Sequence, residues 1–181
     1  MNELLNKILK EENIILSNEQ EKAVQMCMEN QRVLVLGGAG TGKTEIIKIV
    51  SKYFERMGKT VCRMAPTGAA ALKIDGHTIH KEFMISGKIN EFENLSDLAL
   101  LIREKKLRNT DVIIIDEISM LTPIVADFIF KIINYIKIND CKSIKVLCFG
   151  DLFQLPPVIS DIQLMQDFFP HFLGYNFCKG T

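Results

Sequence analysis

The stretch RVLVLGGAGTGKTEIIKIV, residues 32–50, decides the fold of this chain. It starts as an apolar run (RVLVL) that stops at glycines, which predicts a strand buried on both faces. After the glycines, apolar residues recur at helical spacing as far as Phe54. The stretch therefore predicts a strand, a loop and a helix in succession, the repeating unit of a parallel α/β sheet.

The glycine-rich turn matches the pattern G-x-x-x-x-G-K-[ST] in full, between the strand and the helix that this pattern requires. Glycines let the backbone curl so that N–H groups point inward and hold phosphate oxygens, aided by the helix dipole. Lys43 is predicted to bridge the β- and γ-phosphates, and the Thr44 hydroxyl to ligate Mg²⁺. A turn that only packs tightly would not need these two residues. The predicted nucleotide-binding residues are Gly37, Gly38, Ala39, Gly40, Thr41, Gly42, Lys43 and Thr44.

Alternating strands and helices continue along the chain. The strands are too apolar to have a wet face, so the predicted fold class is α/β, a three-layer P-loop NTPase with a mostly parallel sheet and helices on both faces. Ligands in such sheets bind at the carboxyl ends of the strands. The predicted strands are residues 32–36, 60–64, 111–115 and 145–149, and the predicted helices are 3–10, 18–30, 44–57, 67–73, 96–107 and 124–138, with another starting near Thr78.

An acidic pair, Asp116 and Glu117, follows the strand predicted at residues 111–115. We expect it at the carboxyl end of a strand that neighbours the one leading into the phosphate loop. There Asp116 would hold Mg²⁺ through water, and Glu117 would orient and activate the attacking water. A paired acid is expected of a hydrolase, whereas a small-molecule kinase must suppress attack by water. The alternative is a helix N-terminus whose acids complement the helix dipole.

Composition limits the remaining classes. The 181 residues fit one domain, with or without a small appendage, and exclude a large multidomain machine. Lys and Arg total 22 and Asp and Glu total 22, a balance that favours no particular partner. Without a membrane-length apolar run or a signal-peptide core, we expect a soluble, intracellular protein and no membrane partner. Five cysteines without a C-x-x-C pair predict reduced, buried thiols.

Six motifs, taken together, resemble the N-terminal motor domain of superfamily 1B helicases. The likeness is greatest to the PIF-type (petite integration frequency) DNA helicases, with the RecD-like helicases next. It covers residues 16–158 in the order of that family, and it implies a RecA-like fold and an ATP-dependent 5′-to-3′ DNA helicase. The motifs are LSNEQ (16–20), GGAGTGKT (37–44), APTGAAA (65–71), GHTIHKEF (76–83), IIIDEISML (113–121) and GDLFQLPPV (150–158).

The resemblance assigns roles to residues at matching positions. Gln20 is implied to recognise the adenine base, although a capping box with Ser17 also explains this glutamine, and both roles can hold together. Gln154 is implied to sense the γ-phosphate and to couple it to the DNA track, while Asp151 supports that loop or the metal shell. The predicted catalytic residues are Lys43, Asp116, Glu117 and Gln154, the metal ligands are Thr44 and Asp116, and the cofactors are ATP and Mg²⁺.

The same resemblance implies a track for single-stranded DNA along two of the motifs. N–H groups at a helix start can bind a phosphate, and an imidazole or a ring can contact the strand or stack on a base. The alternatives are that Thr67 is an ordinary helix N-cap and that Phe83 is a packed core residue. A metal site at His77 and His80 is disfavoured, because no further ligand stands at a suitable spacing. The implied DNA contacts are Pro66, Thr67, Gly68, His80 and Phe83.

The expected organisation has three parts: N-terminal helices with the adenine motif (1–30), the P-loop ATPase core (31–158), and a truncated extension towards a missing second motor domain (159–181). In the resembled superfamily, ATP lies between two motor domains, and the second supplies arginines that stabilise the transferring phosphoryl group. Arg108 is the last arginine of this chain. We therefore expect a fragment of a longer helicase, or a short protein that needs a partner chain. The alternative function is a nucleotide-dependent DNA- or protein-binding module that does not unwind DNA.

Overall fold

The fold is built on one parallel sheet. The structure, a computed structural model, describes residues 3–83, 106–151 and 176–179. Strands in these ranges are ordered β3-β2-β4-β5-β1-β6, and every neighbouring pair is parallel. This arrangement confirms the predicted α/β class. The strands are β1 (Arg32–Leu36), β2 (Val61–Ala65), β3 (His77–Thr78), β4 (Val112–Ile115), β5 (Lys145–Gly150) and β6 (Asn176–Lys179).

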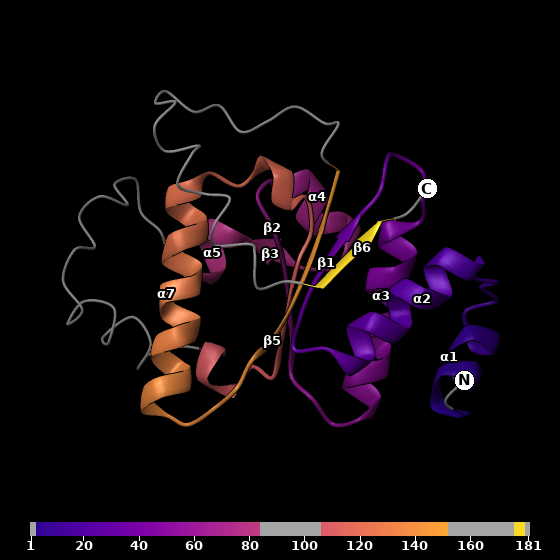
Figure 1. The fold of residues 1–181 in the computed structure, drawn as a ribbon, viewed down its shortest axis with the longest axis horizontal. Helices are drawn as coiled ribbons and strands as arrows, with labels where there is room; N and C mark the ends of the chain where they lie inside the picture. Colours follow the sequence, from indigo (N-terminus) through magenta and orange to yellow (C-terminus); the bar gives the residue numbers. More distant parts are fainter. Residues whose placement is uncertain (1–2, 84–105, 152–175, 180–181) are drawn as a thin grey trace.

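Helices cover both faces of the sheet, as predicted. Alternate strand residues point to opposite faces, so Leu34 of β1 packs with α7 and α5, while Val33 and Val35 pack with α1 to α4 on the other face. Figure 1 shows α7 on one side of the strands and α1, α2 and α3 on the other. The helices are α1 (Glu3–Glu11), α2 (Asn18–Glu29), α3 (Lys43–Arg56), α4 (Gly68–Lys73), α5 (Ile79–Glu82) and α7 (Pro123–Asn139), with 3-10 turns η2 (Lys106–Asn109) and η3 (Ile118–Met120).

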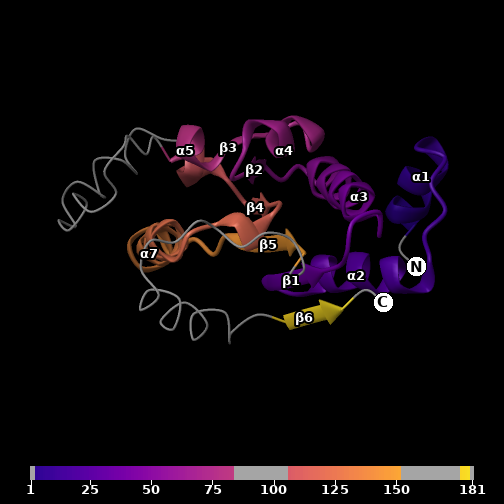
Figure 2. The ribbon, with the colours of Figure 1, turned by 90° about the horizontal axis from the view of Figure 1, so that it is seen from above.

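The four predicted strands agree with the structure to within one residue, but both edge strands were missed. β3 has two residues, too few for an apolar run to be recognised. Residues 176–179 form β6, which pairs with β1 at the edge of the sheet shown in Figure 2. Most of the helix predicted at residues 96–107 lies outside the described residues, and residues 106–109 form a 3-10 turn.

A buried lysine joins the central sheet to helix α2. Lys145 starts β5 and is 8% exposed. Its Nζ donates hydrogen bonds to the carbonyls of Cys27 (2.9 Å), Met28 (3.0 Å) and Asn30 (2.5 Å), and lies 5.2 Å from the ring centroid of Phe54. Burial lowers the pKa of Lys145. Because unsatisfied carbonyls and the negative end of the helix dipole meet at this helix terminus, the ammonium group supplies both hydrogen bonds and charge.

We expect Lys145→Met to destabilise the fold by about 2–3 kcal/mol, because the carbonyls at the end of α2 would lose a charged donor while staying wholly or partly buried. Urea unfolding followed by circular dichroism measures this free energy. Lys137→Met, on the exposed side of α7, is the matched control. Equal stability of the two variants would show that the contacts of Lys145 contribute nothing net.

The thiol prediction holds in part. Cys27, Cys62 and Cys148 are buried thiols outside any disulfide, but Cys141 is exposed because it lies in the turn after α7. Burial raises the pKa of the Cys148 thiol to about 12. No helix in the described part of the chain combines the length and apolar character needed to cross a bilayer.

Candidate nucleotide-binding site

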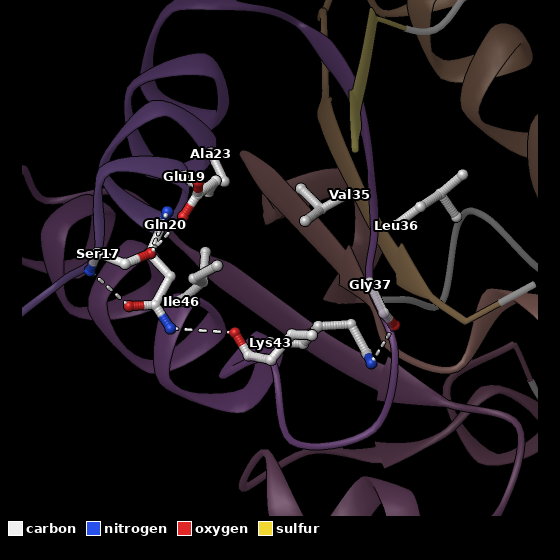
Figure 3. A pocket seen from close by; sticks show the side chains of 10 residues that line it. Ser17, Glu19, Gln20, Ala23, Val35, Leu36, Gly37, Lys43 and Ile46 are labelled. Atoms are coloured by element: carbon white, nitrogen blue, oxygen red, sulfur yellow. Dashed lines mark hydrogen bonds between the residues drawn. The ribbon is translucent and has the colours of Figure 1, made fainter. Parts of the chain in front are cut away.

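The phosphate loop, residues 37–44, follows β1, turns back on itself and continues into the first turn of α3. Gly42 has a φ of 83°, a left-handed conformation that favours glycine, and its carbonyl accepts the hydrogen bond of Ile46 N at 3.1 Å. The Thr41 hydroxyl donates to the Gly38 carbonyl at 2.9 Å. Lys43 Nζ donates to the carbonyls of Gly37 (2.6 Å) and Gly38 (2.9 Å), as Figure 3 shows for Gly37. The loop therefore carries its ammonium group folded back against its own main chain.

Gln20 links helix α2 to this loop. The predicted capping box is confirmed: Gln20 N donates to Ser17 Oγ at 3.3 Å, and Ser17 N donates to Gln20 Oε1 at 2.9 Å. Gln20 Nε2 also donates to the Thr41 carbonyl at 3.0 Å, and a Cβ on Gly42 would lie 2.2 Å from this nitrogen. A side-chain amide has two donors and two acceptor lone pairs. These contacts therefore leave Gln20 the hydrogen-bonding capacity to recognise a base as well.

A cavity of about 220 Å³ lies between α2, the end of β1 and the loop (Figure 3). One part of its wall is apolar and another carries Gln20 and Lys43, a combination suited to a flat ring with a polar edge and a charged tail. The sequence motifs identified Gln20 and the loop but not the apolar part, which comes from the residues next to them. The cavity is lined by Ser17, Glu19, Gln20, Ala23, Val35, Leu36, Gly37, Thr41, Lys43 and Ile46.

The acidic pair lies at the carboxyl end of β4. The expected neighbour relation is wrong, because β5 lies between β4 and β1 in the sheet. Asp116 is 5% exposed, and its Oδ1 accepts a hydrogen bond from Glu117 N at 2.9 Å. Burial raises the pKa of Asp116, while the charge of Lys43 acts in the opposite direction. Although β5 lies between β4 and β1, the Lys43 charge still acts on the Asp116 carboxylate.

Glu117 is held in an unusual position. Its backbone is left-handed, with φ of 52° and ψ of 43°, and it precedes the 3-10 turn η3. Its Oε2 atom is buried and has no hydrogen-bond partner. Strained backbone and unsatisfied buried polar atoms in native proteins concentrate at functional sites. A carboxylate oxygen in this state can accept a hydrogen bond from a water molecule.

The end of β5 contributes to the same edge. The Gly150 carbonyl accepts a hydrogen bond from Gly37 N at 3.1 Å, which joins the start of the phosphate loop to β5. Asp151 follows and is buried. Gln154, predicted to sense the γ-phosphate, lies outside the described residues.

The residues predicted to contact DNA come from two segments, one that follows β2 and one that contains His80 of α5. Pro66, Thr67 and Gly68 follow β2, with Thr67 Oγ1 accepting from Ala70 N at 3.2 Å as the N-cap of α4. Gly68 and His80 are exposed. Among the described residues, neither His80 nor any other side chain belongs to a group of three that could hold a metal ion.

The prediction of DNA contact is wrong for Phe83. Its ring is 1% exposed and packs edge-on against Phe128 at 6.2 Å between centroids. A ring buried between α5 and α7 cannot stack on a base.

Comparison with known proteins gives consistent matches. Residues 20–160 match a family described as AAA domain. The chain is 34% identical over 153 residues to the ATP-dependent DNA helicase PIF1 of Candida albicans, covering 81% of this chain and 17% of that protein. It is 35% identical over 155 residues to the ATP-dependent DNA helicase RRM3 of Saccharomyces cerevisiae, covering 80% and 21%.

A solved structure of a Bacteroides Pif1 helicase in complex with ADP-AlF3 and ssDNA aligns with a TM-score of 0.69 and 31% identity, covering 92% of this chain and 42% of that one. The chain thus spans about a fifth of the length of these two relatives and less than half of the solved structure.

Proposed function

The chain belongs to the AAA domain family as a motor domain of the Pif1 helicase type, and on that premise we propose that it binds and hydrolyses ATP as the N-terminal motor domain of a 5′-to-3′ DNA helicase. One observation carries the proposal. The phosphate loop with Lys43, the buried Asp116 and the half-buried Glu117 lie at the same edge of the sheet, and the charge of Lys43 acts to lower the pKa of Asp116. Phosphoryl transfer needs this combination of phosphate binding, charge compensation and water activation.

The triphosphate would lie along the loop, with Lys43 released from the Gly37 and Gly38 carbonyls to contact phosphate oxygens. The donors present fit Mg²⁺, because the Thr44 hydroxyl and the Asp116 carboxylate are hard oxygen ligands and Mg²⁺ is commonly held by one or two carboxylates plus substrate phosphates. A cation would also offset the burial of Asp116. When bound, the ion supplies charge compensation to the phosphates. Glu117 would accept the proton of the attacking water.

Two glutamines complete the proposed site. Gln20 would recognise the adenine edge with its remaining donor and acceptor, next to the apolar part of the cavity wall. Gln154 would contact the γ-phosphate and couple its presence to the residues that bind DNA. The nucleotide complex of the Bacteroides protein supports nucleotide binding by the domain, while the roles of the two glutamines follow from the motif resemblance.

Single-stranded DNA would run past Pro66, Thr67, Gly68 and His80, and a second motor domain, in the same chain or a partner, would close the ATP site. The proposed division remains residues 1–30, 31–158 and 159–181, although β6 in the last segment adds to the sheet of the core. An intracellular location is part of the proposal, since DNA is the substrate.

The test is steady-state ATP hydrolysis by the protein expressed from its complete reading frame, with and without a single-stranded DNA oligonucleotide. We expect single-stranded DNA to raise turnover by at least about tenfold, because closure on DNA assembles the transition-state contacts. Strand separation on a duplex with a 5′ tail, compared with a 3′ tail, tests the direction. ATP hydrolysis without strand separation on either substrate would favour a nucleotide-dependent binding module instead.

A further inference from the structure

Gly150, the last residue of β5, contacts both the phosphate loop and the acidic turn. Its carbonyl accepts the hydrogen bond of Gly37 N, and it lies opposite Leu36 in the register of the two strands. A Cβ placed on Gly150 would lie 2.7 Å from Ile118 Cγ2 and 3.4 Å from Ser119 N. The turn that follows Glu117 therefore rests directly on the main chain of β5.

The need for glycine at this position is steric. Gly150 is not among the glycines with positive φ, so an alanine could adopt the same backbone. The obstacle to a side chain is Ile118, which is 5% exposed and packed in the core between the sheet and α7. A β-branched side chain is stiff at χ1, so rotation cannot remove Cγ2 from the contact without cost. An added methyl group would therefore displace the main chain of Ile118 and of Glu117 before it.

We propose that Gly150 is a positioning residue for ATP hydrolysis, whose lack of a side chain sets the distance between the Glu117 carboxylate and the phosphate loop. This inference rests on the proposed function. The buried Oε2 of Glu117 has no partner that would hold it in place independently of the turn. The same glycine fixes the start of the phosphate loop through its carbonyl, so both groups are positioned from one point. A displacement of the order of 1 Å between reacting groups can cost about 100-fold in rate.

The first variant is Gly150→Ala, measured in the protein from the complete reading frame with saturating single-stranded DNA. We expect kcat to fall by about 10- to 100-fold. The KM for ATP and the affinity for ADP should stay unchanged, because the hydrogen bond to Gly37 uses the Gly150 carbonyl, which alanine keeps. A loss of nucleotide affinity in step with kcat would mean general damage to the site and would overturn the proposal.

A pair of second-site substitutions separates positioning from general packing. Ile118→Leu removes the Cγ2 methyl that meets the new side chain, whereas Ile118→Val keeps it. Combined with Gly150→Ala, the leucine substitution should recover most of the lost kcat and the valine substitution should not. Equal recovery by both, or recovery by neither, contradicts the proposed contact.

The outcome also separates this inference from the function on which it rests. If the unaltered protein does not hydrolyse ATP, the proposed function fails and the positioning role fails with it. If it hydrolyses ATP and Gly150→Ala leaves kcat unchanged, the positioning role alone is wrong.

Discussion

Replacing Lys43 with alanine is expected to reduce DNA-stimulated ATP hydrolysis by at least about 100-fold, the scale seen when one donor to a developing negative charge is removed. The Lys43 ammonium group lies at the phosphate loop, and its charge reaches Asp116. Catalysis of phosphoryl transfer depends almost entirely on positioning and charge compensation. Steady-state hydrolysis and titration with a fluorescent ATP analogue measure the two effects, and both turnover and affinity should fall.

The matched control is Lys48→Ala, an exposed lysine of the same helix, which should behave as the unaltered protein. Because Lys43 also donates to the Gly37 and Gly38 carbonyls, the melting temperature of both variants must be compared. Turnover by Lys43→Ala close to that of the control would exclude the phosphate loop as the site of hydrolysis.

Glu117→Gln is expected to lower the rate of hydrolysis by about 10²- to 10⁴-fold, the usual contribution of a general base. Glutamine keeps the size of the side chain but cannot accept the proton of the attacking water. Glu117 makes no hydrogen bond through Oε2, so the substitution breaks no contact of that atom. Single-turnover hydrolysis gives the rate of the chemical step, and equilibrium titration should show ATP still bound.

Glu21→Gln, on the exposed face of α2, removes the same charge away from the site and serves as the comparison. Retained ATP binding with lost hydrolysis would separate Glu117 from Lys43, whose loss affects both. A Glu117→Gln protein that hydrolyses ATP at the rate of Glu21→Gln would remove Glu117 from the proposed chemistry.

Much of the fold was predictable because its signals are local. β1 was predicted with the observed bounds, since an apolar run that stops at glycines has few other interpretations. The capping box of Ser17 and Gln20 depends on residues three apart, and the structure contains both of its hydrogen bonds. Two-residue β3 carries no such pattern.

The positions of these elements in space were less predictable. The apolar runs of β1, β4 and β5 look alike, and nothing in them states that β5 lies between the other two. Phe83 could equally line a groove or fill a core until α7 was seen to cover it. Lys145 resembles any charged residue before a strand, yet its ammonium group caps a helix that ends far earlier in the chain.

The sequence by itself determined the chemistry of the candidate site: a glycine-rich loop ending in Lys43 and Thr44, and a strand ending in Asp116 and Glu117. Motif spacing and hydrophobic pattern are properties of neighbouring residues, so they can be read without the fold. Only the tertiary structure decided how these groups meet, through the burial of Asp116, the hydrogen bond of Gln20 to the Thr41 carbonyl and the contact of Gly150 with Ile118. Such contacts join segments distant in the chain and arise from close packing of the whole core.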